Sequence, residues 1–172
     1  MPILPTLSSA AFGVLAVGTL TAAIVDVRTR RIPNVLTATM AGIGIGLAAA
    51  GVSGVSAGAS ALGLLVGFAL MMPGHALGAT GAGDVKLMAA VGAIVGPVVV
   101  ISAFLFTAVA GGVLAVGVAL KRKRLAATLS GTSQLIAAPG DARQQLHSAG
   151  TSSKFAYGPA IAVGSILAAV LR

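Results

Sequence analysis

The sequence predicts an all-α, polytopic membrane protein with about six transmembrane helices. Hydrophobic residues make up 57% of the 172-residue chain, and charged residues only 8%. The charges are separated by long neutral runs, which cover residues 1–25, 32–83, 87–120 and 155–171. Since about 20 apolar residues suffice to cross a bilayer as a helix, each run can hold at least one span.

Turn-forming residues divide the longer runs. We expect residues 1–25 to contain a retained first helix, because no basic segment precedes its apolar stretch as in a signal peptide. The run 32–83 is too long for one span, and its segment 51–58 is rich in Gly and Ser. Gly96-Pro97 divides the next run, because Pro favours the first turn of a helix. The expected helices cover about residues 6–25, 34–51, 56–73, 84–96, 97–120 and 156–171.

The fourth of these helices is unusually short. At about 13 residues it is roughly 20 Å long, less than the hydrocarbon thickness of a bilayer. Asp84 at its start is therefore expected to lie toward the membrane interior, and the Gly-rich segment 73–83 is expected to reach it as an irregular loop. Such backbone is tolerated at depth only where protein buries it or water reaches it.

The basic residues predict the orientation. With six helices, all of the eleven basic residues except Arg172 fall on one face of the membrane. The positive-inside bias places that face in the cytoplasm and both termini outside. Asp26, expected to end the first helix, and Asp84 then share the cytoplasmic face. Residues 1–172 form a single membrane-embedded domain, in which about 121–155 is expected to be a mobile cytoplasmic loop.

Composition argues against several other classes of function. The net charge is +8, but the basic residues lie between apolar runs, as topology requires, and Trp is absent, so no nucleic-acid partner is expected. The chain has no Cys and only two His, so neither a metal nor another cofactor is expected.

Small residues four apart predict close helix packing at Gly42 and Gly46, Gly63 and Gly67, and Gly92 and Gly96.

The only acidic residues are Asp26, Asp84 and Asp141. An acid next to hydrocarbon is a candidate functional residue, which singles out the first two, whereas Asp141 is expected to be a solvated loop residue. Two facing carboxylates can hydrolyse a peptide if one takes a proton from water while the protonated partner polarises the carbonyl. For Asp26 the structural alternative is a helix C-cap or pairing with the nearby arginines. For Asp84 it is stabilisation by the helix dipole.

Three segments carry a resemblance to a known family. They are Asp26-Val-Arg-Thr-Arg-Arg-Ile-Pro-Asn34, Gly81-Ala-Gly-Asp-Val-Lys-Leu87 and Tyr157-Gly-Pro-Ala160. In this order they resemble prepilin peptidases, the type IV prepilin leader peptidase family of the GxGD aspartyl protease class. The similarity is closest to the short forms that serve Tad/Flp-type pilus systems.

The resemblance implies a multi-pass aspartic endopeptidase of the bacterial cytoplasmic (inner) membrane. It would remove the leader peptide from prepilins, of Flp type in this case, at the cytoplasmic face, with Asp26 and Asp84 as the catalytic pair. The cysteine-containing N-terminal region of larger relatives is not seen, so N-methyltransferase activity is not expected.

Lys86, Gly81 and Gly83 are the candidate substrate-binding residues. Lys86 is either a contact for the acidic residue near the start of the substrate helix or a membrane-surface anchor. The two glycines would allow a peptide to approach the backbone closely.

A competing hypothesis is a small proton-coupled transporter or membrane scaffold with Asp26 and Asp84 as proton carriers. Transport sites usually lie near the bilayer midplane, whereas both acids lie toward one face.

Overall fold

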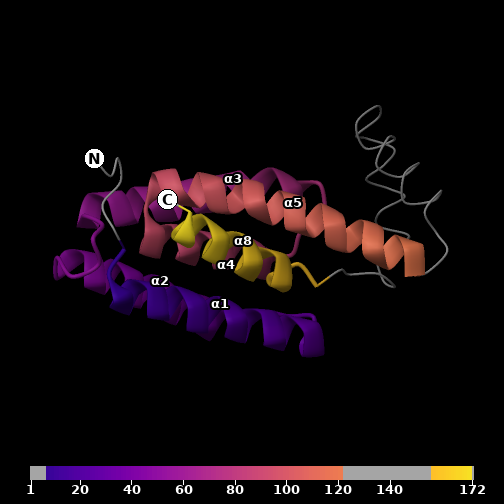
Figure 1. The fold of residues 1–172 in the computed structure, drawn as a ribbon, viewed down its shortest axis with the longest axis horizontal. Helices are drawn as coiled ribbons and strands as arrows, with labels where there is room; N and C mark the ends of the chain where they lie inside the picture. The colour runs from indigo at the N-terminus through magenta and orange to yellow at the C-terminus, as the bar shows by residue number, and fades with distance from the viewer. Residues whose placement is uncertain (1–6, 122–155, 172) are drawn as a thin grey trace.

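The structure of the chain is a computed structural model that describes residues 7–121 and 156–171. These residues form helices and no strand (Figure 1). This confirms the all-α prediction for that part of the chain. The predicted loop beyond Lys121 and the third acid, Asp141, lie outside the described residues. The helices are α1 Ser9–Thr29, α2 Asn34–Ala49, α3 Ala57–Ala76, α4 Ala82–Val95, α5 Pro97–Lys121 and α8 Gly158–Val170.

The helices form three layers. α4 and α8 lie between the pair α1 and α2 on one side and the pair α3 and α5 on the other (Figure 1). α4 packs mainly on α3 and α2, whereas α8 packs mainly on α5 and α1. Because α1 ends where α4 and α8 begin, residues far apart in sequence meet at one end of the bundle (Figure 1).

The short helix α4 is the centre of the bundle. Every residue from Leu87 to Val95 is buried, and five other helices contact α4. A helix that is apolar all round lies either in the core of a protein or in contact with lipid. Its 14 residues give a length of about 21 Å. Its neighbours, rather than lipid, therefore surround it.

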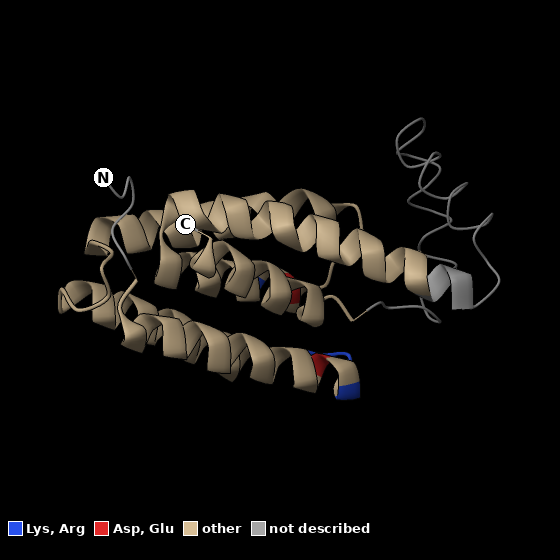
Figure 2. Cartoon of the chain, in the orientation of Figure 1, with Lys and Arg blue, Asp and Glu red and all other residues tan. Residues whose placement is uncertain are grey.

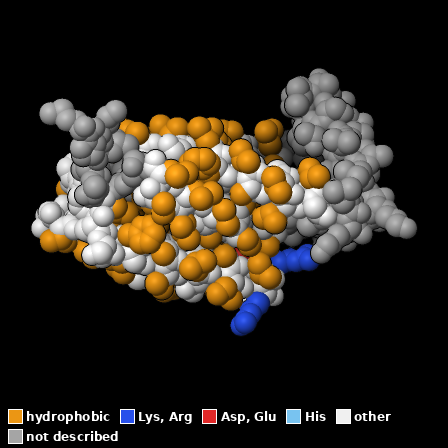
Figure 3. All heavy atoms as spheres, in the orientation of Figure 1, with side chains coloured by type: hydrophobic (Ala, Val, Ile, Leu, Met, Phe, Trp, Pro, Cys, Tyr) orange, Lys and Arg blue, Asp and Glu red, His pale blue; other side chains and the backbone are white. Residues whose placement is uncertain are grey.

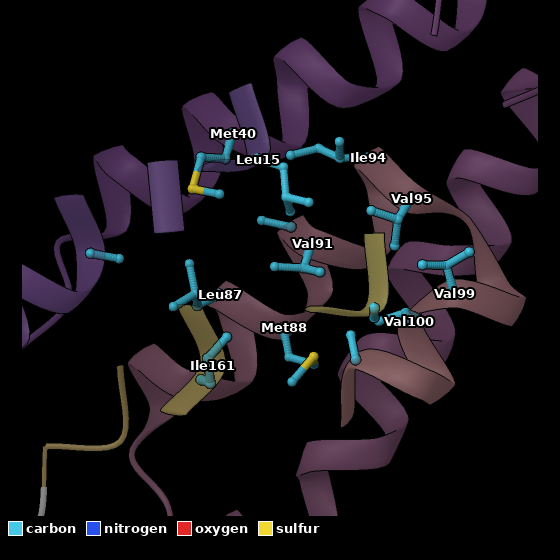
Figure 4. Close-up of a cluster of buried hydrophobic side chains, with 14 of the residues drawn as sticks. Leu15, Met40, Leu87, Met88, Val91, Ile94, Val95, Val99, Val100 and Ile161 are labelled. Carbon is cyan, nitrogen blue, oxygen red and sulfur yellow. The ribbon is translucent and has the colours of Figure 1, made fainter. Parts of the chain in front are cut away.

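Large apolar side chains from four helices fill the core around α4 (Figure 4). Leu15 of α1 and Met40 of α2 lie on one side of it, and Val100 of α5 and Ile161 of α8 are also part of the cluster. All four side chains are at most 3% exposed. Core packing of this kind fixes the helices relative to one another.

The outer surface of the bundle is also apolar (Figure 3). Large hydrophobic side chains such as Val17, Leu65 and Val109 are each more than 60% exposed. Three helices are long and apolar enough to cross a membrane: Ser9–Thr29, Ala57–Ala76 and Pro97–Gly117. A surface of this kind is stable in contact with lipid but not with water. The chain is therefore a membrane protein.

The C-terminal ends of α1 and α3 lie beyond those predicted. α1 continues to Thr29, past the predicted end at residue 25, and stops where Arg30 adopts a left-handed φ of 54° and its N–H bonds the Asp26 carbonyl at 2.7 Å. Asp26 is therefore inside the helix and does not end it. α3 continues through Pro73 to Ala76, because a proline in the last turn removes only one backbone hydrogen bond.

The predicted close packing is found at Gly63, Gly67 and Gly92, but not at Gly42 and Gly46. A Cβ on Gly42 or Gly46 would meet nothing within 4 Å, whereas one on Gly44 would lie 2.8 Å from Ile94 Cγ1. The contact between α2 and α4 thus uses the glycine between the predicted two. Gly96 follows α4 with a φ of 81°, so its role is to end the helix and not to pack in one.

Candidate active site

The charged side chains that the structure describes gather toward one end of the bundle (Figure 2). This is the end where α1 finishes and where α4 and α8 begin. The group comprises Asp26, Arg28, Arg30, Arg31, Asp84 and Lys86. The three arginines are exposed, whereas both aspartates are buried. The two acids are thus separated from the basic residues by their burial.

Asp26 continues the buried stripe of α1. The buried residues before it include Leu15, Thr19 and Ala22, which follow the helical spacing of three or four residues. The Asp26 side chain is only 6% exposed, and its Oδ2 accepts a hydrogen bond of 2.8 Å from the N–H of Gly158. Helix periodicity therefore directs this carboxylate toward α8, whereas the neighbouring Arg28 and Arg30 are exposed.

Asp84 lies in the first turn of α4 and is 7% exposed. Its Oδ2 accepts a hydrogen bond of 2.9 Å from the N–H of Gly81, the residue that precedes the helix. This is the acidic half of a capping box, with glycine in place of the usual serine or threonine. The positive end of the helix dipole further stabilises an acid at this position.

The two aspartates come together although they lie on different helices. Their carboxylates are close enough for direct electrostatic interaction. Tyr157, next to the residue that binds Asp26, also interacts electrostatically with Asp84. The first residues of α8 are therefore close to both acids. The structure thus brings together the two aspartates that the sequence singled out.

A buried pair of carboxylates can hold one proton between them and exchange it with a water or a substrate carbonyl. Within residues 7–121 and 156–171, no group of three or more His, Cys, Asp or Glu side chains could hold a metal ion. The chemistry that the two carboxylates themselves offer is proton transfer.

Lys86 is exposed, unlike the two buried aspartates. Its Nζ donates a hydrogen bond of 2.9 Å to Oδ1 of Asn34, and its side chain is exposed. The contact links the second turn of α4 to the first residue of α2. Lys86 is thus tied to the surface beside the site.

Each of the two candidate substrate-binding glycines has a structural role in the fold. Gly81 supplies the N–H that binds Asp84. A Cβ on Gly83 would lie 3.0 Å from Cβ of Ile32, so its small size admits the loop after α1. Neither role depends on a bound peptide.

Gly158 is the site residue that the sequence analysis did not select. The available signal is the segment Tyr157-Gly-Pro-Ala160, which predicts the start of the last helix and, by its place in the family resemblance, a position near the site. Its contact with Asp26 joins residues 132 positions apart. A separation of that size leaves no local pattern, so only the packing of α8 on α1 reveals it.

The fold and the site together define a class of protein, a helical membrane protein with a buried aspartate pair at one end. Residues 13–116, more than half of the chain, match the model of the type IV leader peptidase family. The chain therefore belongs to this family, which confirms the resemblance, and the family implies a peptidase of the aspartic type. No curated protein and no solved structure matches the chain.

Proposed function

We propose that the protein is an endopeptidase that removes the leader peptide from prepilins, with Asp26 and Asp84 as its catalytic pair. Membership of the type IV leader peptidase family supports the substrate class. The observation that carries the catalytic assignment is that two buried carboxylates from α1 and α4, 6% and 7% exposed, lie near enough to interact electrostatically. Buried acids are energetically costly in a membrane protein, so they usually mark a functional site.

The reaction follows from the two protonation states of such a pair. The ionised carboxylate takes a proton from a water, whose oxygen attacks the carbonyl carbon of the scissile peptide bond. The protonated partner gives its proton to the carbonyl oxygen, which produces a neutral gem-diol. The C–N bond then breaks as the amine nitrogen receives the first proton and the gem-diol returns the second. The pair ends in its starting state, and one water has been consumed.

The place of the site in the bundle suits a substrate of this kind. A prepilin has a leader at the membrane surface followed by an apolar helix, and the aspartates lie toward one end of an apolar bundle (Figures 2 and 3). We infer an orientation with this end at the cytoplasmic face of the bacterial inner membrane, with six membrane-crossing helices and both termini outside. The exposed Arg28, Arg30 and Arg31 near Asp26 support it through the positive-inside bias.

The substrate is best tested directly. The purified protein, reconstituted into liposomes, is incubated with a Flp-type prepilin, and removal of the leader is followed by mass spectrometry. We expect cleavage by the wild type and a loss of at least about 100-fold in Asp26→Asn and Asp84→Asn, because an amide cannot transfer protons as the reaction requires. Asp141→Asn, which removes the third acid, is the matched control and should cleave normally.

Near-normal cleavage by either amide variant would refute the catalytic assignment. A wild type that never cleaves a prepilin would refute the proposed substrate. If the liposomes then showed a proton flux that needs both aspartates, the transporter hypothesis would replace the peptidase.

A further inference from the structure

We propose that the backbone N–H of Gly158 is a positioning group for Asp26, and that the site requires glycine at this position for the sake of that carboxylate. The proposal rests on the proposed peptidase function. Residue 158 lies beyond the region 13–116 that matches the family model, so the match does not bear on it.

The first turn of α8 leaves this N–H without a partner of its own. The first N–H groups of a helix have no intrahelical acceptor, and a preceding side chain usually caps them. Tyr157, the residue before α8, makes no such side-chain bond, and Pro159 has no N–H. Asp26 Oδ2 fills this place from another helix, at 2.8 Å from the Gly158 nitrogen.

The absence of a side chain at position 158 serves Asp26 and not the local backbone. Gly158 is not among the glycines with a positive φ, so alanine could adopt its backbone conformation. A Cβ there, however, would lie 3.0 Å from both Cβ and Oδ2 of Asp26. These contacts are tighter than ordinary van der Waals contacts, and the carboxylate is buried. An alanine would therefore displace the Asp26 carboxylate.

The same device occurs at the other acid. Gly81 also has a negative φ, of −78°, its N–H bonds Oδ2 of Asp84, and a Cβ on it would lie 3.2 Å from that oxygen. Each carboxylate is thus held through one oxygen by the amide of a glycine.

Two carboxylates held in this way are oriented before the substrate arrives. Catalytic groups act well only when they are held within about 0.5 Å of the productive geometry, and small displacements lower the rate of the chemical step. A disturbance at Gly158 should therefore reduce kcat and leave KM nearly unchanged, because the amide touches Asp26 and not the substrate.

The test compares Gly158→Ala with Ser165→Ala in reconstituted protein that cleaves a Flp-type prepilin. Ser165 lies in the same helix, is buried, and its hydroxyl has no partner within the described residues. We expect kcat to fall at least about tenfold in Gly158→Ala with KM changed less than about twofold, and Ser165→Ala to resemble the wild type. A Gly158→Ala variant that keeps the wild-type kcat per folded molecule, whatever its melting temperature, would overturn the proposal.

A second variant removes the N–H without adding an atom beyond the backbone. Glycolic acid placed at position 158 by suppressor tRNA in cell-free synthesis gives an ester, which cannot donate to Asp26. We expect kcat to fall at least about tenfold, as for loss of a charge-assisted hydrogen bond. This variant decides the matter if Gly158→Ala does not accumulate, and an unchanged kcat would overturn the proposal. Failure of the wild type to cleave would instead refute the proposed function.

Discussion

Gly63 of α3 lies against Gly92 of α4 so closely that neither position has room for a side chain. A Cβ on Gly63 would lie 2.8 Å from the carbonyl carbon of Gly96, and one on Gly92 would lie 2.6 Å from the carbonyl carbon of Gly63. The obstacles are backbone atoms, which cannot rotate away as the end of a side chain can. This contact fixes the position of α4, and therefore of Asp84 at its start, against α3.

We predict that Gly63→Ala destabilises the protein, because a methyl group would force the two backbones apart. Overpacking of this kind typically costs about 1–3 kcal/mol. Gly46→Ala is the control, since a Cβ there meets nothing within 4 Å. Thermal unfolding in detergent micelles measures both. A melting temperature of Gly63→Ala equal to that of Gly46→Ala would contradict the predicted contact between α3 and α4.

We predict that the two ends of the bundle face opposite sides of the membrane, with the aspartates toward the cytoplasm. Val52, between α2 and α3, and Ala79, between α3 and α4, are both exposed in the turns at either end of α3. The natural chain has no cysteine. Val52→Cys should therefore react with an impermeant thiol reagent added to intact cells, and Ala79→Cys only after the cells are opened. The reverse labelling pattern would overturn the orientation.

We predict that Lys86 recognises an acidic residue near the start of the substrate helix. A carboxylate that enters a partly desolvated site needs a positive partner. Lys86 is exposed beside the site, and its ammonium group donates a hydrogen bond to the neutral side chain of Asn34. The measurement compares a prepilin with its Glu→Gln variant as substrates for the wild type and for Lys86→Gln. The substrate change should lower kcat/KM much less in the mutant enzyme. Equal discrimination by both enzymes would leave Lys86 as a link between α4 and α2.

We predict that cleavage needs no metal ion. A pair of carboxylates can activate water without one, since proton transfer between the acids, the water and the carbonyl suffices. Prepilin cleavage by the reconstituted protein should therefore persist after treatment with EDTA. Activity that is lost on chelation and restored by a divalent cation would contradict the two-aspartate reaction.

Composition and turn residues were enough to predict most of the fold. Long neutral apolar runs predicted the helices, and Gly96-Pro97 marked the boundary between α4 and α5. The end of α1 was placed too early because Asp26 and the arginines after it suggested a polar boundary. Tertiary packing overrode that signal, since a carboxylate with a buried hydrogen-bond donor can lie inside a helix.

The sequence alone singled out Asp26 and Asp84 as candidates, because acids are conspicuous in a chain with only three of them and long apolar runs. Only the tertiary structure decided what holds them. The partners of Asp26 and Asp84 are backbone N–H groups, which every residue except proline carries. The residue types in the sequence therefore do not identify these partners. Gly158 becomes a partner of Asp26 only when α8 packs against α1, and that contact depends on the whole bundle around α4.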